Sequence, residues 1–131
     1  MAQDFQSFID RIKAERPEEF VTVPHEVDPA HEITATVVKT EQEARKRPVF
    51  QFDNVKGTDF KVMTNLHASR NRLALALGCA PRDMQKKFLS AMENPIPPKE
   101  INTGPCKDVI LKGADVDMRA LPQIEHHGDD G

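Results

Sequence analysis

The sequence predicts an α/β fold, with α+β as the alternative: a small mixed sheet flanked by about four helices. Three observations predict this class. Apolar residues recur with helical spacing in several segments, short alternating runs rich in Val and Phe lie between them, and Pro or Gly stands at the junctions. Because helical and extended segments are interleaved along only 131 residues, they indicate a small layered domain rather than a helix bundle or a β-sandwich.

The first expected elements are a helix and a short strand. Four apolar residues recur at helical spacing near the N-terminus: Phe5, Phe8, Ile9 and Ile12. This helix should end near Arg16, because Pro17 disfavours helical geometry in the residue before it. Residues 20–23 alternate as a short strand, and Pro24 predicts that the strand lies at a sheet edge or ends there.

A second helix is expected to start at Asp28 and Pro29. Aspartate can accept hydrogen bonds from first-turn amides, and proline at the first helical position costs no hydrogen bond within the helix. The apolar stripe of this helix consists of Ile33, Val37 and Val38. We interpret the charged run at residues 41–47 as its solvated end.

The middle of the chain predicts a β-hairpin. Residues 48–52 have the pattern of a strand with Phe50 and Phe52 on one face. Residues 53–57 carry turn chemistry, and residues 60–66 alternate as the return strand.

Two further helices follow the hairpin. Ser69 is placed to cap a helix over residues 70–77, which Gly78 would close in the left-handed conformation. We expect its inward face to be Leu73, Ala76 and Leu77. Pro81 opens another helix, which ends before Asn94.

The remaining chain carries weaker patterns. Residues 95–98 are rich in proline and predict an extended connector, and residues 108–111 predict one more short strand. The stretch 114–131 has little apolar periodicity and is typical of a chain that leads into another domain. We therefore divide the chain into a domain of residues 1–113 and a lead-in segment of residues 114–131.

Composition restricts the partners and the location. Eighteen Lys and Arg stand against 21 Asp and Glu, so the net charge of −3 predicts no general attraction to nucleic acid or anionic lipid. Apolar runs stop well short of the roughly 20 residues of a membrane span. Since residues 1–5 lack the features of an export signal, we expect a cytoplasmic location, with Cys79 and Cys106 as free thiols.

The densest group of metal-ligand residue types lies near the C-terminus: His126, His127, Asp129 and Asp130. Adjacent histidines in an extended chain point to opposite sides, and no separated third histidine or cysteine completes a zinc spacing. We therefore interpret this group as a polar loop.

Other polar groups have similarly plain interpretations. One surrounds Pro29 and predicts a polar turn into a helix: His25, Glu26, Asp28, His31 and Glu32. Asp115 with Asp117, or Glu100 alone, could in principle do acid/base chemistry, but nothing in the sequence indicates that they are buried. Nucleophile-elbow, phosphate-loop and dinucleotide motifs do not occur.

Three stretches carry a resemblance by their order and spacing: residues 48–57, residues 65–78, and residues 116–122 running to 126–131. They resemble the N-terminal part of the UbiD-like decarboxylases, which include polyprenyl-hydroxybenzoate decarboxylase. The opening helix and the turn at residues 26–29 also fit, so the resemblance covers nearly the whole chain. The sequence departs at Asp53, where the family commonly has Glu, and at residues 67–68, where it has Phe-Gly.

The resemblance implies reversible, non-oxidative decarboxylation of an aromatic or α,β-unsaturated acid. Family members use prenylated FMN with Mn²⁺ and K⁺, in a split-barrel domain that follows the Asp-Gly pair matched by residues 130–131. The lead-in would thus end where that domain begins, and we expect no catalytic, cofactor-binding or metal-binding residue within residues 1–131.

The same resemblance implies that this segment is structural and inactive alone. Its expected partner is the remainder of a decarboxylase chain or a catalytic subunit, and homo-oligomers are expected only for the full-length enzyme. Two alternatives stay open: a standalone acidic binding or regulatory module, and the small subunit of a split decarboxylase.

Overall fold

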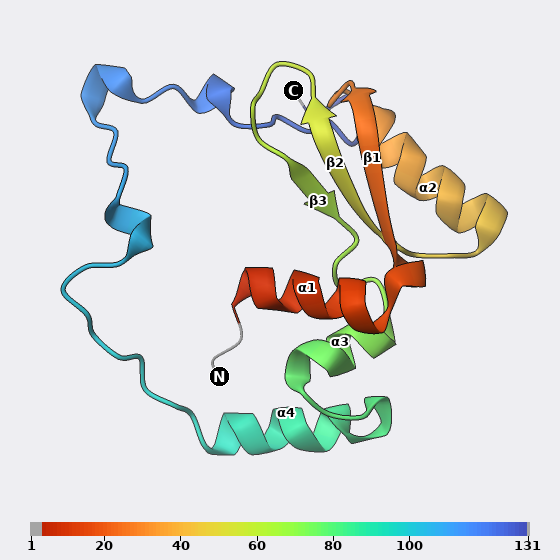
Figure 1. Cartoon of the computed structure of the whole chain (residues 1–131), viewed down its shortest axis with the longest axis vertical. Coiled ribbons are helices and arrows are strands. Elements are labelled where there is room, and N and C mark those ends of the chain that lie inside the picture. The colour runs from red at the N-terminus through yellow and green to blue at the C-terminus, as the bar shows by residue number, and fades with distance from the viewer. Residues whose placement is uncertain (1–3, 131) are drawn as a thin grey trace.

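The structure, a computed structural model, describes residues 4–130. Residues 1–3, on which part of the export argument rests, and Gly131 of the lead-in lie outside the described residues. The helices and strands are α1 (Phe5–Glu15), β1 (Phe20–Val27), α2 (Glu32–Ala44), β2 (Val49–Val55), β3 (Val62–Thr64), α3 (Arg70–Leu77) and α4 (Met84–Glu93). The predicted mixed α/β class is confirmed (Figure 1).

The three strands form one mixed sheet in the order β1-β2-β3. β1 runs parallel to β2, and β2 pairs antiparallel with β3, so the predicted hairpin is confirmed. Gly57 adopts a φ of 84° in the connecting turn, a conformation that glycine reaches without steric strain. β3 is shorter than the return strand expected over residues 60–66.

β1 is longer than the strand expected over residues 20–23, because it continues through Pro24 to Val27. It is an edge strand, which agrees with the edge position that Pro24 predicts. Its pairing with β2 shifts register between Val23 and Glu26, around the proline that lacks an N–H donor.

The two faces of the sheet have separate cores. One cluster lies beneath α2 and contains Val23, Val27, Ile33, Phe50, Phe52, Val55 and Val62. The other joins α1 and α3 to the sheet and contains Phe8, Ile9, Ile12, Val49 and Leu75. The rings of Phe50 and Phe52 stack with centroids 5.9 Å apart, so the two phenylalanines share a face as predicted. α2 thereby covers one face of the sheet, and α1 with α3 covers the other face near the start of β2 (Figure 1).

The start of α2 differs from the prediction. The Asp28 carboxylate accepts a hydrogen bond from the amide of Ala30 at 3.0 Å and one from Lys56 Nζ at 2.8 Å. It closes a local turn instead of capping the helix, which begins at Glu32 after His31 with its φ of 70°. The expectation of a helix start at residue 28 is therefore wrong by one turn.

α3 has the caps that its sequence predicts and a different buried face. Ser69 accepts a hydrogen bond from the Arg72 amide, and Gly78 closes the helix at a φ of 62°. The buried residues of the helix are Arg72, Ala74 and Leu75, whereas the expected Leu73, Ala76 and Leu77 are half-buried and only Ala76 of these three packs against the core cluster. Arg72 and Leu75, three residues apart, lie on the same side of the helix and face the core.

Residues 95–118, here called the arc, leave the body after α4 and return to its far side (Figure 1). The arc contains short 3-10 turns and coil, so the strand predicted at residues 108–111 is wrong. Val109 is 75% exposed, and no described strand lies beside it to supply backbone partners. Among residues 4–130, no helix has the length and apolar character needed to cross a membrane.

The chain beyond the arc is tied back to the body. Thr58 Oγ1 donates to the carbonyl oxygen of Ala120 at 2.7 Å, and Glu125 forms a parallel β-bridge with Ala30. Ile124 packs against the core cluster beneath α2. The lead-in segment, residues 114–131, thus contacts the domain that precedes it. The division of the chain at residue 113 stays a prediction.

Candidate functional site

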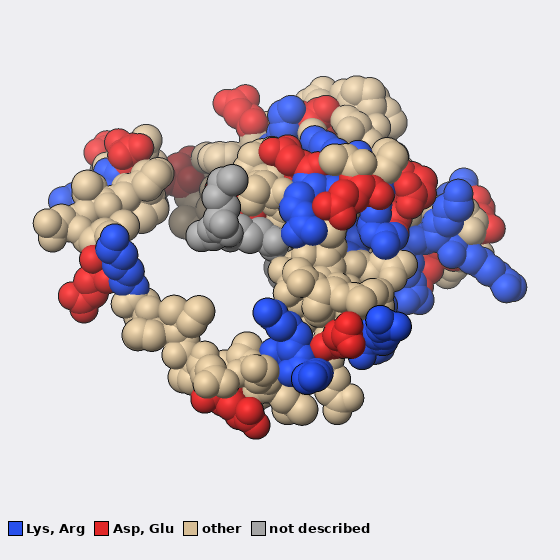
Figure 2. Space-filling view, turned by 60° about the horizontal axis from the view of Figure 1, so that its bottom comes forward, with Lys and Arg blue, Asp and Glu red and all other residues tan. Residues whose placement is uncertain are grey.

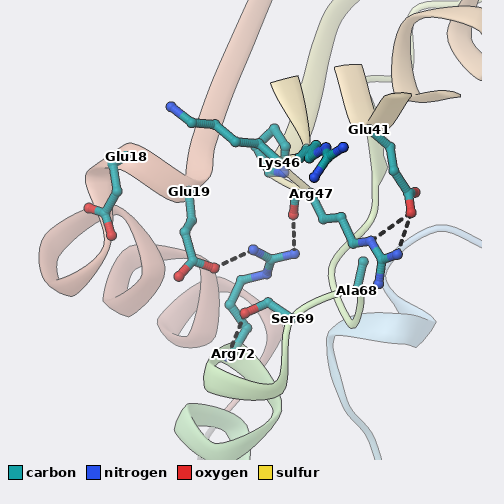
Figure 3. A pocket seen from close by; sticks show the side chains of 10 residues that line it. Glu18, Glu19, Glu41, Lys46, Arg47, Ala68, Ser69 and Arg72 are labelled. Atoms are coloured by element: carbon teal, nitrogen blue, oxygen red, sulfur yellow. Dashed lines mark hydrogen bonds and ion pairs between the residues drawn. The ribbon is translucent and has the colours of Figure 1, made fainter. Parts of the chain in front are cut away.

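A polar hollow of about 610 Å³ lies at the ends where β1 and β2 begin. It is bounded by the 3-10 turn Pro17–Glu19, the C-terminal end of α2, the loop into β2 and the start of α3 (Figure 3). Its lining residues are Glu18, Glu19, Glu41, Arg45, Lys46, Arg47, Pro48, Ala68, Ser69 and Arg72.

Arg72 forms the buried floor of the hollow, with 1% of its surface exposed. Its Nε donates to the carbonyl oxygen of Leu66 at 3.1 Å. Its Nη2 donates to the carbonyl oxygens of Arg47 at 2.6 Å and Asn65 at 2.8 Å. Its Nη1 donates to the Glu19 carboxylate, as Figure 3 shows. One guanidinium therefore joins three segments that are far apart in sequence.

Glu19 is the charged partner that balances this buried arginine. Partial burial acts to raise the pKa of Glu19, but hydrogen bonds from Arg16, Arg72 and Ser69 outweigh it and lower the pKa below its usual range. Arg16 Nη1 lies 2.8 Å from Glu19 Oε1. The carboxylate is thus held in its ionised form between two guanidinium groups.

This arrangement makes part of the stability of the fold dependent on pH. The pKa of Glu19 is lower in the folded state than in the unfolded chain, so its contribution is present above about pH 4.3 and is lost as the pH falls through the folded value. We expect Glu19→Gln to lower the free energy of unfolding by roughly 1–2 kcal/mol at pH 7 and by less at pH 3.

Urea titration followed by circular dichroism at both pH values measures this difference. Glu18→Gln is the matched control, because Glu18 lines the same hollow without a described ion pair. A Glu19→Gln protein as stable as the wild type at pH 7 would contradict the assigned role.

The rim of the hollow carries no group that is arranged for catalysis. Arg47 Nε donates to Glu41 Oε1 at 2.7 Å, while Arg45 and Lys46 form no ion pair with a described residue. The lining contains no histidine or cysteine, and its only hydroxyl, that of Ser69, caps α3. A nucleophile with a neighbouring base is therefore not found in this hollow.

The predicted polar loop near the C-terminus folds as a turn. Asp130 Oδ2 accepts hydrogen bonds from the amides of His126 at 2.9 Å and His127 at 2.8 Å. The bonds from His127 and His126 lower the pKa of Asp130. His126 Nδ1 lies 2.7 Å from Thr34 Oγ1. Within residues 4–130 no three His, Cys, Asp or Glu side chains are grouped as metal ligands, and the absence of a metal site stays a prediction.

The polar group around Pro29 is also engaged in local structure. The hydrogen bond from Lys56, and then that from the Ala30 amide, lowers the pKa of Asp28, and Asp28 in turn raises the pKa of Lys56. His31 Nε2 lies 4.0 Å from Glu125 Oε2, whereas His25 is exposed on β1.

The three candidate carboxylates of the arc are exposed, so the structure supplies no buried environment for acid/base work. Asp117 accepts bonds from the side chain and the amide of Arg119, and these lower its pKa. Asp115 and Glu100 have no ion pair with a described residue. Of the two free thiols, Cys79 is half-buried and Cys106 is exposed.

Arg72 is the residue that the sequence analysis missed. A local signal existed, because Arg72 stands three positions before Leu75, and helical spacing places both on one face. Only the fold shows that three carbonyl groups and Glu19 surround that position.

Comparison with known families identifies the domain. The model of the 3-octaprenyl-4-hydroxybenzoate carboxy-lyase N-terminal domain matches residues 13–92, which is more than half of the chain. The chain belongs to this UbiD family. The resemblance found in the sequence is thereby confirmed, and the hollow with Arg72 lies inside the matched region of this UbiD N-terminal domain.

Solved UbiD-class enzymes have the same fold. An evolved dimeric form of HmfF from Pelotomaculum thermopropionicum, in complex with prFMN, is 25% identical with a TM-score of 0.83, over 96% of this chain and 29% of that chain. The apo 3,4-dihydroxybenzoic acid decarboxylase of Enterobacter cloacae is 29% identical with a TM-score of 0.64, over 74% and 21%.

The vanillic acid decarboxylase of Sedimentibacter hydroxybenzoicus, in its open form, resembles the UbiD N-terminal domain in fold, with a TM-score of 0.77 at 24% identity. That match covers 97% of this chain and 28% of the other. The chain therefore spans less than a third of the length of each of these solved structures.

Proposed function

We propose that this UbiD-class N-terminal domain is the structural portion of a carboxy-lyase. The enzyme would decarboxylate an aromatic or α,β-unsaturated carboxylic acid, reversibly and without oxidation, using prenylated FMN. The observation that supports this most is the family match over residues 13–92. The likeness to HmfF, which was solved with prFMN, supports the choice of cofactor. A cytoplasmic location is part of the same proposal.

The hollow around Arg72 does not fit the cofactor itself. Flavin sites are lined largely by apolar and aromatic side chains, whereas this hollow is lined mainly by charged residues and has no aromatic ring. The carboxylates of Glu19 and Glu41 are already paired with arginines, and residues 4–130 present no three-ligand group for Mn²⁺. Prenylated FMN, Mn²⁺ and K⁺ would therefore be held by other polypeptide, and no catalytic step is assigned to these residues.

The contribution of this domain would be a rigid shape beside the catalytic part. Arg72 fixes the start of α3 to the loop before β2 and to the turn before β1. Because an arginine with four fixed acceptors has little freedom, these loops are held in one arrangement. Such a domain can pack beside a flavin domain and cover its substrate cleft.

The small-subunit alternative has one observation in its favour. The vanillic acid decarboxylase of similar fold is an assembly, ShVdcCD, that includes a component named ShVdcD. A UbiD-class enzyme can therefore contain more than one kind of component, and a flavin-containing partner that co-purifies with this chain would decide for that alternative.

The test compares the 131-residue chain with the complete protein encoded by its gene, both produced in cells that make prenylated FMN. Flavin absorbance and CO₂ release are measured on a panel that includes 3,4-dihydroxybenzoate and vanillate. We expect both signals in the complete protein and neither in the short chain. Complete protein that carries only FMN serves as the control for the cofactor.

Two results would overturn the proposal. Flavin binding with CO₂ release by the 131-residue chain would refute its structural role. A complete protein, co-produced with any partner subunit, that neither binds the flavin nor releases CO₂ from any acid of the panel would refute the reaction.

A further inference from the structure

The arc carries apolar side chains that nothing in the described structure covers. Ile96 is 93% exposed, and the large apolar residues that follow it are exposed as well: Ile101, Val109, Ile110, Leu111, Val116 and Met118. Helix α4 continues this surface with its exposed residues Phe88, Leu89 and Met92. A run of this extent is more than the scattered apolar residues of an ordinary surface, and it is typical of an interaction site.

Both ends of the arc are fixed to the body. At one end α4 contacts α3, and at the other Ala120 accepts the hydrogen bond from Thr58 while the half-buried Ile124 packs against the core. The space-filling view in Figure 2 shows an open window between the arc and the body. A segment anchored at both ends around an open window is arranged to enclose something, not to hang free as a tail.

The charges of the arc favour a protein surface as the occupant. Lysines alternate with acidic residues along it: Lys99, Glu100, Lys107, Asp108, Lys112, Asp115 and Asp117. Since the two signs nearly cancel, phosphate-rich partners would gain little, and the contact must depend on burial of apolar area.

The comparison with HmfF indicates which protein surface the arc contacts. The match covers 96% of this chain at a TM-score of 0.83, so fewer residues are unmatched than the arc contains. Most of the arc therefore has a counterpart in an enzyme chain of which this chain spans only 29%. The arc is apolar and uncovered in this chain, and a segment of similar structure occurs in the longer HmfF chain. A contact between the arc and the additional polypeptide of such an enzyme would explain both observations.

We infer that the arc and the exposed apolar residues of α4 form a strap that closes around the flavin-bearing part of a UbiD-class enzyme. This inference rests on the proposed function and adds the surface through which the domain acts. The apolar side chains of the arc make the contact, and the two anchors hold the strap in place before the partner arrives.

Hydrogen exchange of the amides at residues 95–118 tests the inference in the 131-residue chain and in the complete holoenzyme. In the short chain these amides should exchange close to the rate of unprotected chain, and in the holoenzyme about 100-fold or more slowly. A holoenzyme that decarboxylates while the arc exchanges freely would overturn the strap and leave the proposed function standing. Protection with an inactive holoenzyme would refute the function alone.

Two variants make the test specific. Ile110→Asp places a charge in the apolar run, and Asn102→Asp adds the same charge at an exposed polar position of the arc. We expect Ile110→Asp to speed exchange of the arc in the holoenzyme about tenfold or more, and Asn102→Asp to leave it unchanged. Both variants should unfold like the wild type in the short chain, because neither side chain belongs to the core.

Equal effects of the two variants in the holoenzyme would overturn the inference. Protection of the arc in the short chain, together with a doubled mass in light scattering, would also overturn it, by showing that a second copy covers this surface.

Discussion

Replacing Arg72 by methionine is expected to lower the free energy of unfolding by about 3–5 kcal/mol, because it breaks a buried charge network and leaves the partly buried Glu19 carboxylate with Arg16 as its remaining charged partner. Three carbonyl oxygens, those of Arg47, Asn65 and Leu66, lose their donor at the same time. Unmade hydrogen bonds at buried acceptors cost more than the made bonds contribute. The apolar replacement fills the space but satisfies none of the four acceptors.

Arg70→Met is the matched control for this change. Arg70 lies on the same helix and is exposed, with one long contact of 3.5 Å to the carbonyl oxygen of Pro81. Arg72→Lys should also be destabilised, because an ammonium group cannot match the planar fork of a guanidinium. Urea unfolding must be followed by circular dichroism, since the chain contains no Trp or Tyr. Equal stability of the Arg72→Met and Arg70→Met proteins would show that the buried network stabilises nothing.

Shortening Phe52 to alanine is expected to cost about 3–5 kcal/mol, as for other large buried aromatic residues. Phe52 is fully buried on the central strand, between its neighbours Val23 on β1 and Val62 on β3. It also stacks on Phe50. A cavity at this position is bordered on both sides by strands, which cannot move inward without breaking the sheet.

Phe60→Ala provides the comparison, because Phe60 is 53% exposed just before β3. Its effect should stay within about 0.5 kcal/mol, as is usual for surface positions. The thermal midpoints of both variants, monitored by circular dichroism, measure the difference. A Phe52→Ala protein that melts together with Phe60→Ala would contradict the central position of Phe52 in the core.

Local patterns were sufficient wherever neighbouring residues decide the structure. The helical spacing near the N-terminus, the caps Ser69 and Gly78, and the two alternating runs of the hairpin predicted α1, α3 and the pair β2–β3. These features depend on side chains within a few residues of one another. The family resemblance, also carried by local stretches, was confirmed for the same reason.

The predictions that failed concern features of the structure that are set by residues far apart in the sequence. Residues 108–111 have a strand pattern, yet a strand exists only where another strand pairs with it. Asp28 caps a turn because Lys56, in the following hairpin, holds its carboxylate. The role of Arg72 was not predicted, since its acceptor Glu19 lies 53 positions away in the sequence.

Pro24 and the register shift beside it have a consequence for how the sheet meets its surroundings. The free side of an edge strand is a template on which a strand from another molecule can grow, and such growth leads to aggregation. Because a proline interrupts the ladder within β1, an incoming strand finds no unbroken row of donors and acceptors along its eight residues. The interruption thus opposes aggregation through the free side of β1, which stays uncovered in this three-stranded sheet.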